Sequence, residues 1–269
     1  MIVHVKDEWF PILGRLWEEA FGDDIQAAKR FFRGIFRNAH SWCDISKGEP
    51  VSVIYGIPAL VWRDSDGYDK EPAEYLYAGA TWKKERGKGH YGRVIDQAVT
   101  NCTQNGRKVF LVPAQGLAPF YRAHHFDTVM QEKDDYYDAK RCVWEEKRRE
   151  ENIIWETGKI TAREYKKIRD AVLGRIGYVE WEEAFLDYAI QSAEIAEKIT
   201  IKGKEELILA NTFQGCLRIL ETTLDKELMP YFADSIMNQY CCDQICIRGN
   251  ELMSTEKGWN PYFKIALDE

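Results

Sequence analysis

The segment best suited to chemistry is a glycine-bearing loop rich in basic residues. Residues 78–92 read Ala-Gly-Ala-Thr-Trp-Lys-Lys-Glu-Arg-Gly-Lys-Gly-His-Tyr-Gly. A strand-like run precedes the loop and a helical pattern follows it, so the loop should open a helix. The N-terminus of a helix offers unbonded N–H groups and a partial positive charge, which suit a pyrophosphate. Gly87 and Gly89 would let the backbone approach such an anion closely.

Two common nucleotide-binding motifs do not explain this loop. It is not a P-loop, because the spacing G-x4-G-K-[ST] is absent, and the dinucleotide pattern G-x-G-x-x-G is incomplete after Gly92. Lys83, Lys84, Arg86 and Lys88 still concentrate positive charge here, in an otherwise acidic chain. An ordinary surface turn remains the alternative interpretation of the loop taken alone.

Metal chemistry has little support in the sequence. The group Cys241-Cys242-x3-Cys246 is the only metal-like arrangement, and it lacks a second ligand pair at zinc-finger spacing. The seven cysteines are an odd number, so we expect free, mostly buried thiols and no disulfide framework. His124 and His125 are neighbours and cannot share a helix face. We therefore predict no metal site.

Composition excludes several classes of protein. The chain has 269 residues, of which 45% are hydrophobic and 13% aromatic, so it can build a core and is not disordered. A net charge of −7 argues against general nucleic-acid binding, which rewards a basic surface. No run approaches the ~18 apolar residues of a membrane span, and the first residues lack a signal-peptide pattern. We expect a cytoplasmic protein without a membrane partner.

Periodicity predicts the elements that position the loop. Apolar residues at helical spacing predict helices over about 11–21, 25–38 and 90–105, and a short helix at 115–124. Strand-like runs lie at 41–46, 51–61, 74–82, 108–112 and from 127. Pro58 indicates an edge, a bulge or an early end of its strand. This order predicts an α/β domain.

The rest of the chain shows a second α/β pattern without a glycine-rich loop. A charge run at 145–151 is typical of a connector or a solvated helix face. The pattern predicts helices at 162–176, 181–195 and 228–240, and strands at 206–210, 216–221, 244–248 and 262–267. We therefore predict two domains, residues 1–138 and 139–269.

The loop in this context resembles the GNAT superfamily of acyl-CoA-dependent N-acetyltransferases. Their acetyl-CoA loop has the form [Q/R]-x-x-G-x-[G/A] between a strand and a helix, and residues 86–90, Arg-Gly-Lys-Gly-His, match it. Tyr91 stands where Gly or Ala is usual, with Gly92 one step late. Residues 119–126, Pro-Phe-Tyr-Arg-Ala-His-His-Phe, resemble the family's second block, with His125 in place of the usual Gly. Residues 16–23 look like the first helix of a bacterial two-part subgroup.

The resemblance implies a fold class and an activity. The fold would be α/β (α+β), a GNAT fold with a mixed, mostly antiparallel central sheet flanked by helices. A second, smaller and degenerate GNAT-like half would follow it. Acetyl-CoA would be the co-substrate, and the acceptor would be a primary amine of a small molecule or peptide. Neither the identity of that amine nor the oligomeric state can be predicted.

The resemblance also implies site residues. Backbone groups of Ala80, Thr81 and Trp82 would hold the pantetheine arm, and one N–H could polarise the thioester carbonyl. The pyrophosphate would lie against Arg86, Gly87, Lys88, Gly89, His90, Tyr91 and Gly92. Tyr121 matches the tyrosine that protonates the departing thiolate in many relatives. Its alternative role is to pack on the cofactor.

The general base and the activity itself leave alternatives open. Water or a carboxylate could take the proton of the amine. Glu74, at the start of its strand, is one candidate, and the C-terminal carboxylate at Glu269 is another. A non-catalytic CoA-binding or sensor protein is the alternative to an enzyme, and an interaction protein is a third possibility. The presence of Tyr121 favours the enzyme.

Overall fold

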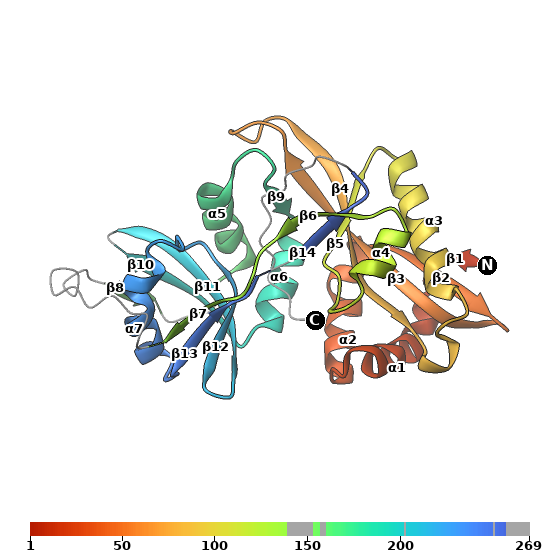
Figure 1. Cartoon of the computed structure of the whole chain (residues 1–269), viewed down its shortest axis with the longest axis horizontal. Coiled ribbons are helices and arrows are strands. Elements are labelled where there is room, and N and C mark those ends of the chain that lie inside the picture. Colours follow the sequence, from red (N-terminus) through yellow and green to blue (C-terminus); the bar gives the residue numbers. More distant parts are fainter. Residues whose placement is uncertain (139–152, 157–159, 202, 250, 257–269) are drawn as a thin grey trace.

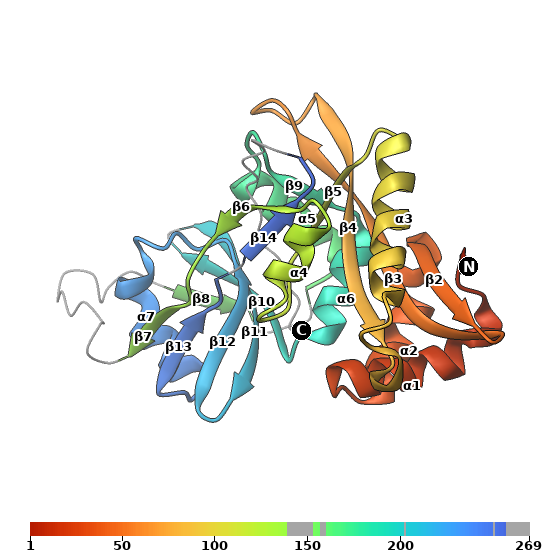
Figure 2. The same cartoon turned by 45° about the vertical axis from the view of Figure 1, so that its right-hand side comes forward.

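The computed structural model describes residues 1–138, 153–156, 160–201, 203–249 and 251–256, with residues 153–156 as backbone only. Two β-sheets form two lobes, and helices α5 (Ala162–Leu173) and α6 (Glu183–Ser192) lie between them (Figures 1 and 2). Helix α6 packs against helix α2 (Ile25–Arg33) of the first lobe, and α5 packs against strand β11 (Lys204–Phe213) of the second.

The sheet of the first lobe is mixed but mostly antiparallel, which confirms the predicted fold class. Only β4 and β5 run parallel. In spatial order its strands are β1 (Ile2–Val3), β2 (His40–Ser46), β3 (Glu49–Trp62), β4 (Lys70–Thr81), β5 (Lys108–Leu111), β14 (Glu251–Ser254) and β6 (Asp127–Gln131), with β9 (Val179–Trp181) paired to β3.

Helices cover both faces of this sheet because its strands alternate apolar residues on two sides. Tyr55 and Tyr77 belong to the core beneath α1 (Phe10–Phe21) and α2. Ile54 and Leu76, one residue earlier on the same strands, belong to the core beneath α3 (His90–Gln104). Short helices complete the lobe: η1 (Asp7–Trp9), η2 (Ile35–Asn38), η3 (Lys83–Glu85) and α4 (Ala118–Ala123).

The second lobe has a sheet of its own, covered by helix α7 (Met229–Gln239). Its strand order is β7 (Asp135–Asp138), β13 (Gln244–Ile247), β12 (Cys216–Thr222), β11, β10 (Ile195–Ile201) and β8 (Ile153–Glu156).

The two sheets exchange strands. After β6 in the first sheet the chain enters the second sheet as β7, beside β13. After β13 it returns to the first sheet as β14, between β5 and β6. Figure 1 shows both crossings side by side between the lobes. The two sheets are therefore interlaced. The domain limits 1–138 and 139–269 stay a prediction.

Some predicted elements differ from the structure. The helix predicted at 181–195 is wrong at its start, because Val179–Trp181 pairs with β3 as a strand. The helix predicted at 162–176 ends at Leu173, before Gly174. Strand β3 continues through Pro58, which lies between the stretch paired with β2 and the stretch paired with β9. The predicted strand 262–267 and the charge run 145–151 lie outside the described residues.

Two negative findings concern the described ranges. Within them no helix is both long enough and apolar enough to span a membrane. The same residues contain no group of three His, Cys, Asp or Glu side chains arranged to hold a metal ion.

Candidate functional site

A bulge in β4 marks the point where this strand leaves its parallel neighbour. Ala78 and Gly79 of β4 together oppose the single residue Ile54 of β3, and Ala78 has a positive φ of 50°. Such a conformation is strained for a residue with a side chain. Pairing with β5 covers only Ala73–Tyr75, although β4 runs on to Thr81. The predicted pantetheine residues Ala80 and Thr81 therefore lie where β4 and β5 have separated.

The glycine loop leads from the end of β4 into α3, as predicted. Gly87 and Gly89 have φ values of 76° and 75°, which favour glycine. Gly89 is the N-cap of α3 and offers no side-chain acceptor to the first turn. The N–H groups of His90, Tyr91 and Gly92 precede the first backbone bond of the helix, Arg93 N–H to the Gly89 carbonyl. The N-terminus of α3 can thus receive an anion.

Several charges of this loop are already paired. The buried carboxylate of Asp44 accepts hydrogen bonds from His90 Nδ1 and Arg93 Nη2, both at 2.8 Å, and from the Met1 amino group at 3.0 Å. Burial alone would raise the pKa of Asp44, but these three donors hold it below its usual value. Glu85 accepts from Lys88 Nζ at 2.9 Å.

The side chains of Lys83, Lys84 and Arg86 form no salt bridge within the described part of the chain. Arg86 Nε donates to the backbone carbonyl of Thr81 at 3.2 Å, which holds the loop against the end of β4. These three cations are exposed in the loop that leads into α3.

Tyr121 of α4 is buried and belongs to the core beneath α3. Its hydroxyl is 3.0 Å from the hydroxyl of Tyr91, at the first turn of α3. The Tyr91 hydroxyl rests on Gly79, where a Cβ on that glycine would overlap it. The structure thus brings Tyr121, Tyr91 and the β4 bulge together. The sequence did not predict that Gly79 makes room for the Tyr91 hydroxyl, although an Ala-Gly pair inside a strand is typical of a bulge.

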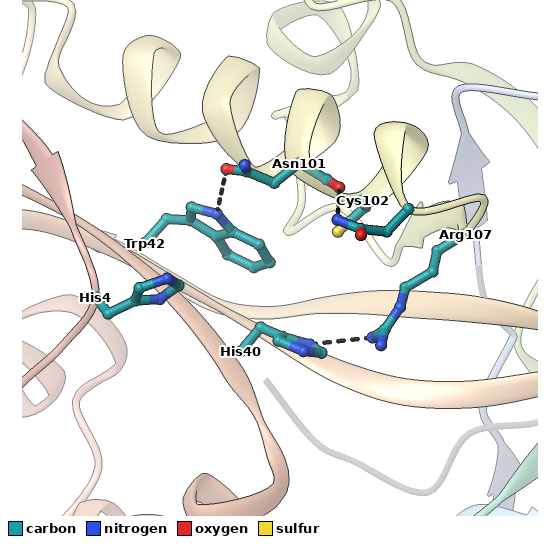
Figure 3. Close-up of a pocket in the computed structure, with 7 residues that line it drawn as sticks. His4, His40, Trp42, Asn101, Cys102 and Arg107 are labelled. Atoms are coloured by element: carbon teal, nitrogen blue, oxygen red, sulfur yellow. Dashed lines mark hydrogen bonds between the residues drawn. The ribbon is translucent and has the colours of Figure 1, made fainter.

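Glu74 lies elsewhere, beneath the C-terminal end of α3. Its carboxylate is fully buried and accepts from Arg107 Nη1 at 2.6 Å and His40 Nδ1 at 2.7 Å. Both partners line a cavity of about 260 Å³, whose other lining residues are His4, Trp42, Asn101, Cys102 and Asn105 (Figure 3). None of these residues belongs to the glycine loop or to α4.

The polar side chains around the cavity beside Glu74 are paired with one another. The charge of Arg107 is met by Glu74, and Trp42 Nε1 donates to Asn101 Oδ1 at 3.0 Å. Burial raises the pKa of the Cys102 thiol to about 12, which leaves it protonated and unreactive at neutral pH. These contacts favour a structural role for Glu74. Its role as general base stays a prediction, and Glu269 lies outside the described residues.

Comparison with known proteins gives matches in structure only. No protein-family model and no curated protein sequence matches the chain. A GCN5-related N-acetyltransferase from Anabaena variabilis is similar, with a TM-score of 0.73 at 13% identity, over 94% of this chain and 72% of that one. A probable N-acyltransferase from Enterococcus faecalis has a TM-score of 0.70 at 14% identity, over 93% of this chain and 65% of that one.

A third match has a length close to that of this chain. A putative acetyltransferase from Pyrococcus horikoshii has a TM-score of 0.60 at 10% identity, over 97% of this chain and 90% of that one. The chain thus has the fold of the GCN5-related N-acetyltransferases, and the similarity extends over both lobes. It spans only about two thirds of the length of the Enterococcus structure.

Proposed function

We propose that the protein is an acyltransferase that moves an acetyl group from acetyl-CoA to a primary amine. One observation carries the proposal. The β4 bulge beyond the β4–β5 pairing and the uncapped N-terminus of α3 meet at Tyr91, whose hydroxyl lies 3.0 Å from that of the buried Tyr121. A strand edge for pantetheine, an anion site and a proton donor are thus adjacent.

The proposed binding mode follows from these parts. The pyrophosphate lies against the first turn of α3 and the basic side chains of Lys84 and Arg86. The pantetheine arm follows Trp82, Thr81 and Ala80 along the edge that β5 leaves open. The thioester then reaches the bulge, where a backbone N–H of β4 polarises its carbonyl.

The transfer is a direct attack. The neutral amine forms a C–N bond to the thioester carbon, and the C–S bond then breaks with its electron pair on sulfur. Tyr121 gives its proton to the departing thiolate and regains one from solvent. The surplus proton of the amine goes to water or to a carboxylate.

A second candidate, a non-catalytic CoA-binding protein, rests on one specific observation. The carboxylate predicted as a base, Glu74, is buried against Arg107 and His40 instead of facing Tyr121. In such a protein the loop would bind CoA and no acyl transfer would follow.

Thiol release from acetyl-CoA, measured over a panel of primary amines, tests the proposal. We expect at least one amine to be acetylated, with a product mass increased by one acetyl group. Tyr121→Phe keeps the ring and removes only the proton donor, so single-turnover transfer should fall by about 10²-fold, whereas acetyl-CoA binding should not become weaker. Binding of acetyl-CoA without transfer to any amine would support the second candidate instead. Unchanged turnover in Tyr121→Phe would reduce this tyrosine to a packing residue.

A further inference from the structure

We propose that Tyr91 is a gate on the acetyl-CoA path: its phenol lies across this path and must move aside when the cofactor binds. The inference rests on the proposed function. It concerns the residue at which the loop departs from the usual glycine or alanine.

The first support is steric. Tyr91 belongs to the first turn of α3, but its phenol crosses to β4 and lies on the backbone of Gly79. A Cβ on Gly79 would overlap the Tyr91 hydroxyl oxygen, and its nearest other contacts would be further atoms of the same ring. The ring therefore occupies the space above the bulge. That is where the thioester end of the cofactor would lie in the proposed binding mode.

The second support is that Tyr91 bridges all the elements around that space. Its hydroxyl lies 3.0 Å from that of Tyr121, and its ring stacks on Phe120 with centroids 5.5 Å apart and an interplanar angle of 24°. Phe120 and Tyr121 both belong to α4. One side chain thus joins α3, α4 and β4 across the path of the pantetheine arm.

The closed position is held by contacts of moderate strength. Loss of the hydroxyl–hydroxyl bond changes an equilibrium by about 2- to 10-fold. Loss of an aromatic stack has an effect of similar size. A protein that must open before it binds has its affinity reduced by the fraction of open molecules. Tyr91 should therefore weaken acetyl-CoA binding, whereas a residue that held the cofactor would strengthen it.

Calorimetric titration of the full chain with acetyl-CoA shows whether the Tyr91 side chain weakens or strengthens binding. Tyr91→Phe removes the hydroxyl and keeps the stack, so the dissociation constant should fall by about 2- to 10-fold. Tyr91→Ala removes the ring, and the dissociation constant should fall by about 3- to 30-fold. Tyr68→Ala is the matched control, because Tyr68 is 91% exposed in the loop between β3 and β4. The Tyr68→Ala variant should bind acetyl-CoA with the affinity of the wild type.

The outcomes separate the gate from the proposed function. If the wild type binds acetyl-CoA and Tyr91→Ala binds it equally or more weakly, the gate is wrong and the proposed function stands. If wild type and both variants bind none, the proposed function fails, and the gate fails with it because opening the path admitted nothing. Thermal unfolding of each variant establishes that it is folded, and Tyr91→Phe preserves the packing if Tyr91→Ala does not fold.

Discussion

A single buried carboxylate fixes the loop end of α3. Asp44 of β2 gathers His90 and Arg93 of the first helical turns, and its side chain is 2% exposed. Charge-assisted hydrogen bonds to a buried group are stronger than surface ion pairs, because water does not compete for them. Asp44 therefore fixes the first turn of α3, where the proposed anion site lies, relative to the sheet.

Asp44→Asn should lower the free energy of unfolding by about 1–3 kcal/mol at pH 7, because it weakens hydrogen bonds to charged donors. The folded protein holds the pKa of this carboxyl below 3.8, so the stabilisation is present above that pH. It is lost as the pH falls through the lower pKa of the folded state. Urea denaturation of wild type and variant across this range measures the difference. If the difference in the free energy of unfolding between wild type and variant stayed constant into strong acid, the ionised Asp44 would not be the source of this stabilisation.

Gly79 and Tyr91 should be energetically coupled. Gly79→Ala places a methyl group where the Tyr91 hydroxyl lies, so it should destabilise the wild type by about 1–3 kcal/mol. In a Tyr91→Ala background that space is empty, and the same change should cost little. A double-mutant cycle on thermal or urea stability gives the coupling. Additive effects would show that the two residues do not share the space.

At the residue scale, sequence alone could identify groups by type and spacing. The loop glycines and Tyr121 could be predicted because each belongs to a local pattern. The contact of Tyr91 with Gly79 could not be predicted, because it depends on where α3 crosses β4. The partners of Glu74 could not be predicted either, because they depend on how distant strands pair. Arg107 is 33 residues away and reaches it only through the parallel pairing of β4 and β5.

At the scale of elements, the strand exchange decides how the lobes hold together. Strand β14 lies between β5 and β6, so the first sheet is continuous only because of a segment near residue 250. Leu252 and Met253 of this strand are fully buried and belong to the cores on opposite faces of that sheet. An interior strand of the first sheet is thus supplied by residues 251–254, which follow the second sheet in sequence.

Met253→Ala should lower the free energy of unfolding of the protein by about 2–5 kcal/mol, because it opens a cavity in the core beneath α3. We expect lower unfolding temperature and weaker acetyl-CoA binding together, since β14 supports β5 and α4 follows β5. Phe213→Ala, a change at a 58% exposed side chain in β11, is the control and should alter neither. Loss of stability confined to the second lobe would show that β14 does not support the first sheet.

Helices and local strands can be predicted from periodicity, because the pattern lies within each element's own residues. The stripes of α1 and α3 follow their own residues, so these helices lie where the pattern placed them. The helix predicted at 25–38 is divided at Gly34 into α2 and η2. Strands β7, β9 and β14 are four residues or fewer, and their pairing partners lie far away in sequence. Short apolar runs do not identify their partners, so the exchange and the β9 pairing with β3 could not be foreseen.

At the scale of the whole molecule, a shared core joins the two lobes, and a buried arginine of α5 contacts a strand of each sheet. Arg169 Nη1 donates to the Val179 carbonyl of β9 at 2.9 Å. Arg169 of α5 donates through Nε to Glu221 of β12 at 2.9 Å, and the side chains are 0% and 1% exposed. Tyr165 donates to the same carboxylate at 2.7 Å. One core cluster contains residues of α1 and β4 together with residues of α5, α6 and β11. The lobes should therefore unfold as one unit.

Glu221→Gln leaves the buried guanidinium of Arg169 without its counter-charge, so we expect a loss of about 3–5 kcal/mol. The unfolding curve should shift as a whole when followed by tryptophan fluorescence and by far-UV circular dichroism. Noncoincident curves, with one lobe melting alone, would mean that the lobes are independent.

The central claim is that the first lobe binds acetyl-CoA at the α3 loop, with one molecule per chain. Calorimetric titration of wild type, Gly89→Val and Gly106→Val tests it most directly. Gly106, at the other end of α3, has a φ of 70° against 75° for Gly89, so both valines meet the same backbone strain. We predict one site per chain in the wild type, affinity near wild type in Gly106→Val and at least about 10-fold weaker binding in Gly89→Val. Absent binding, two sites per chain, or equal affinity in the two valine variants would contradict the account.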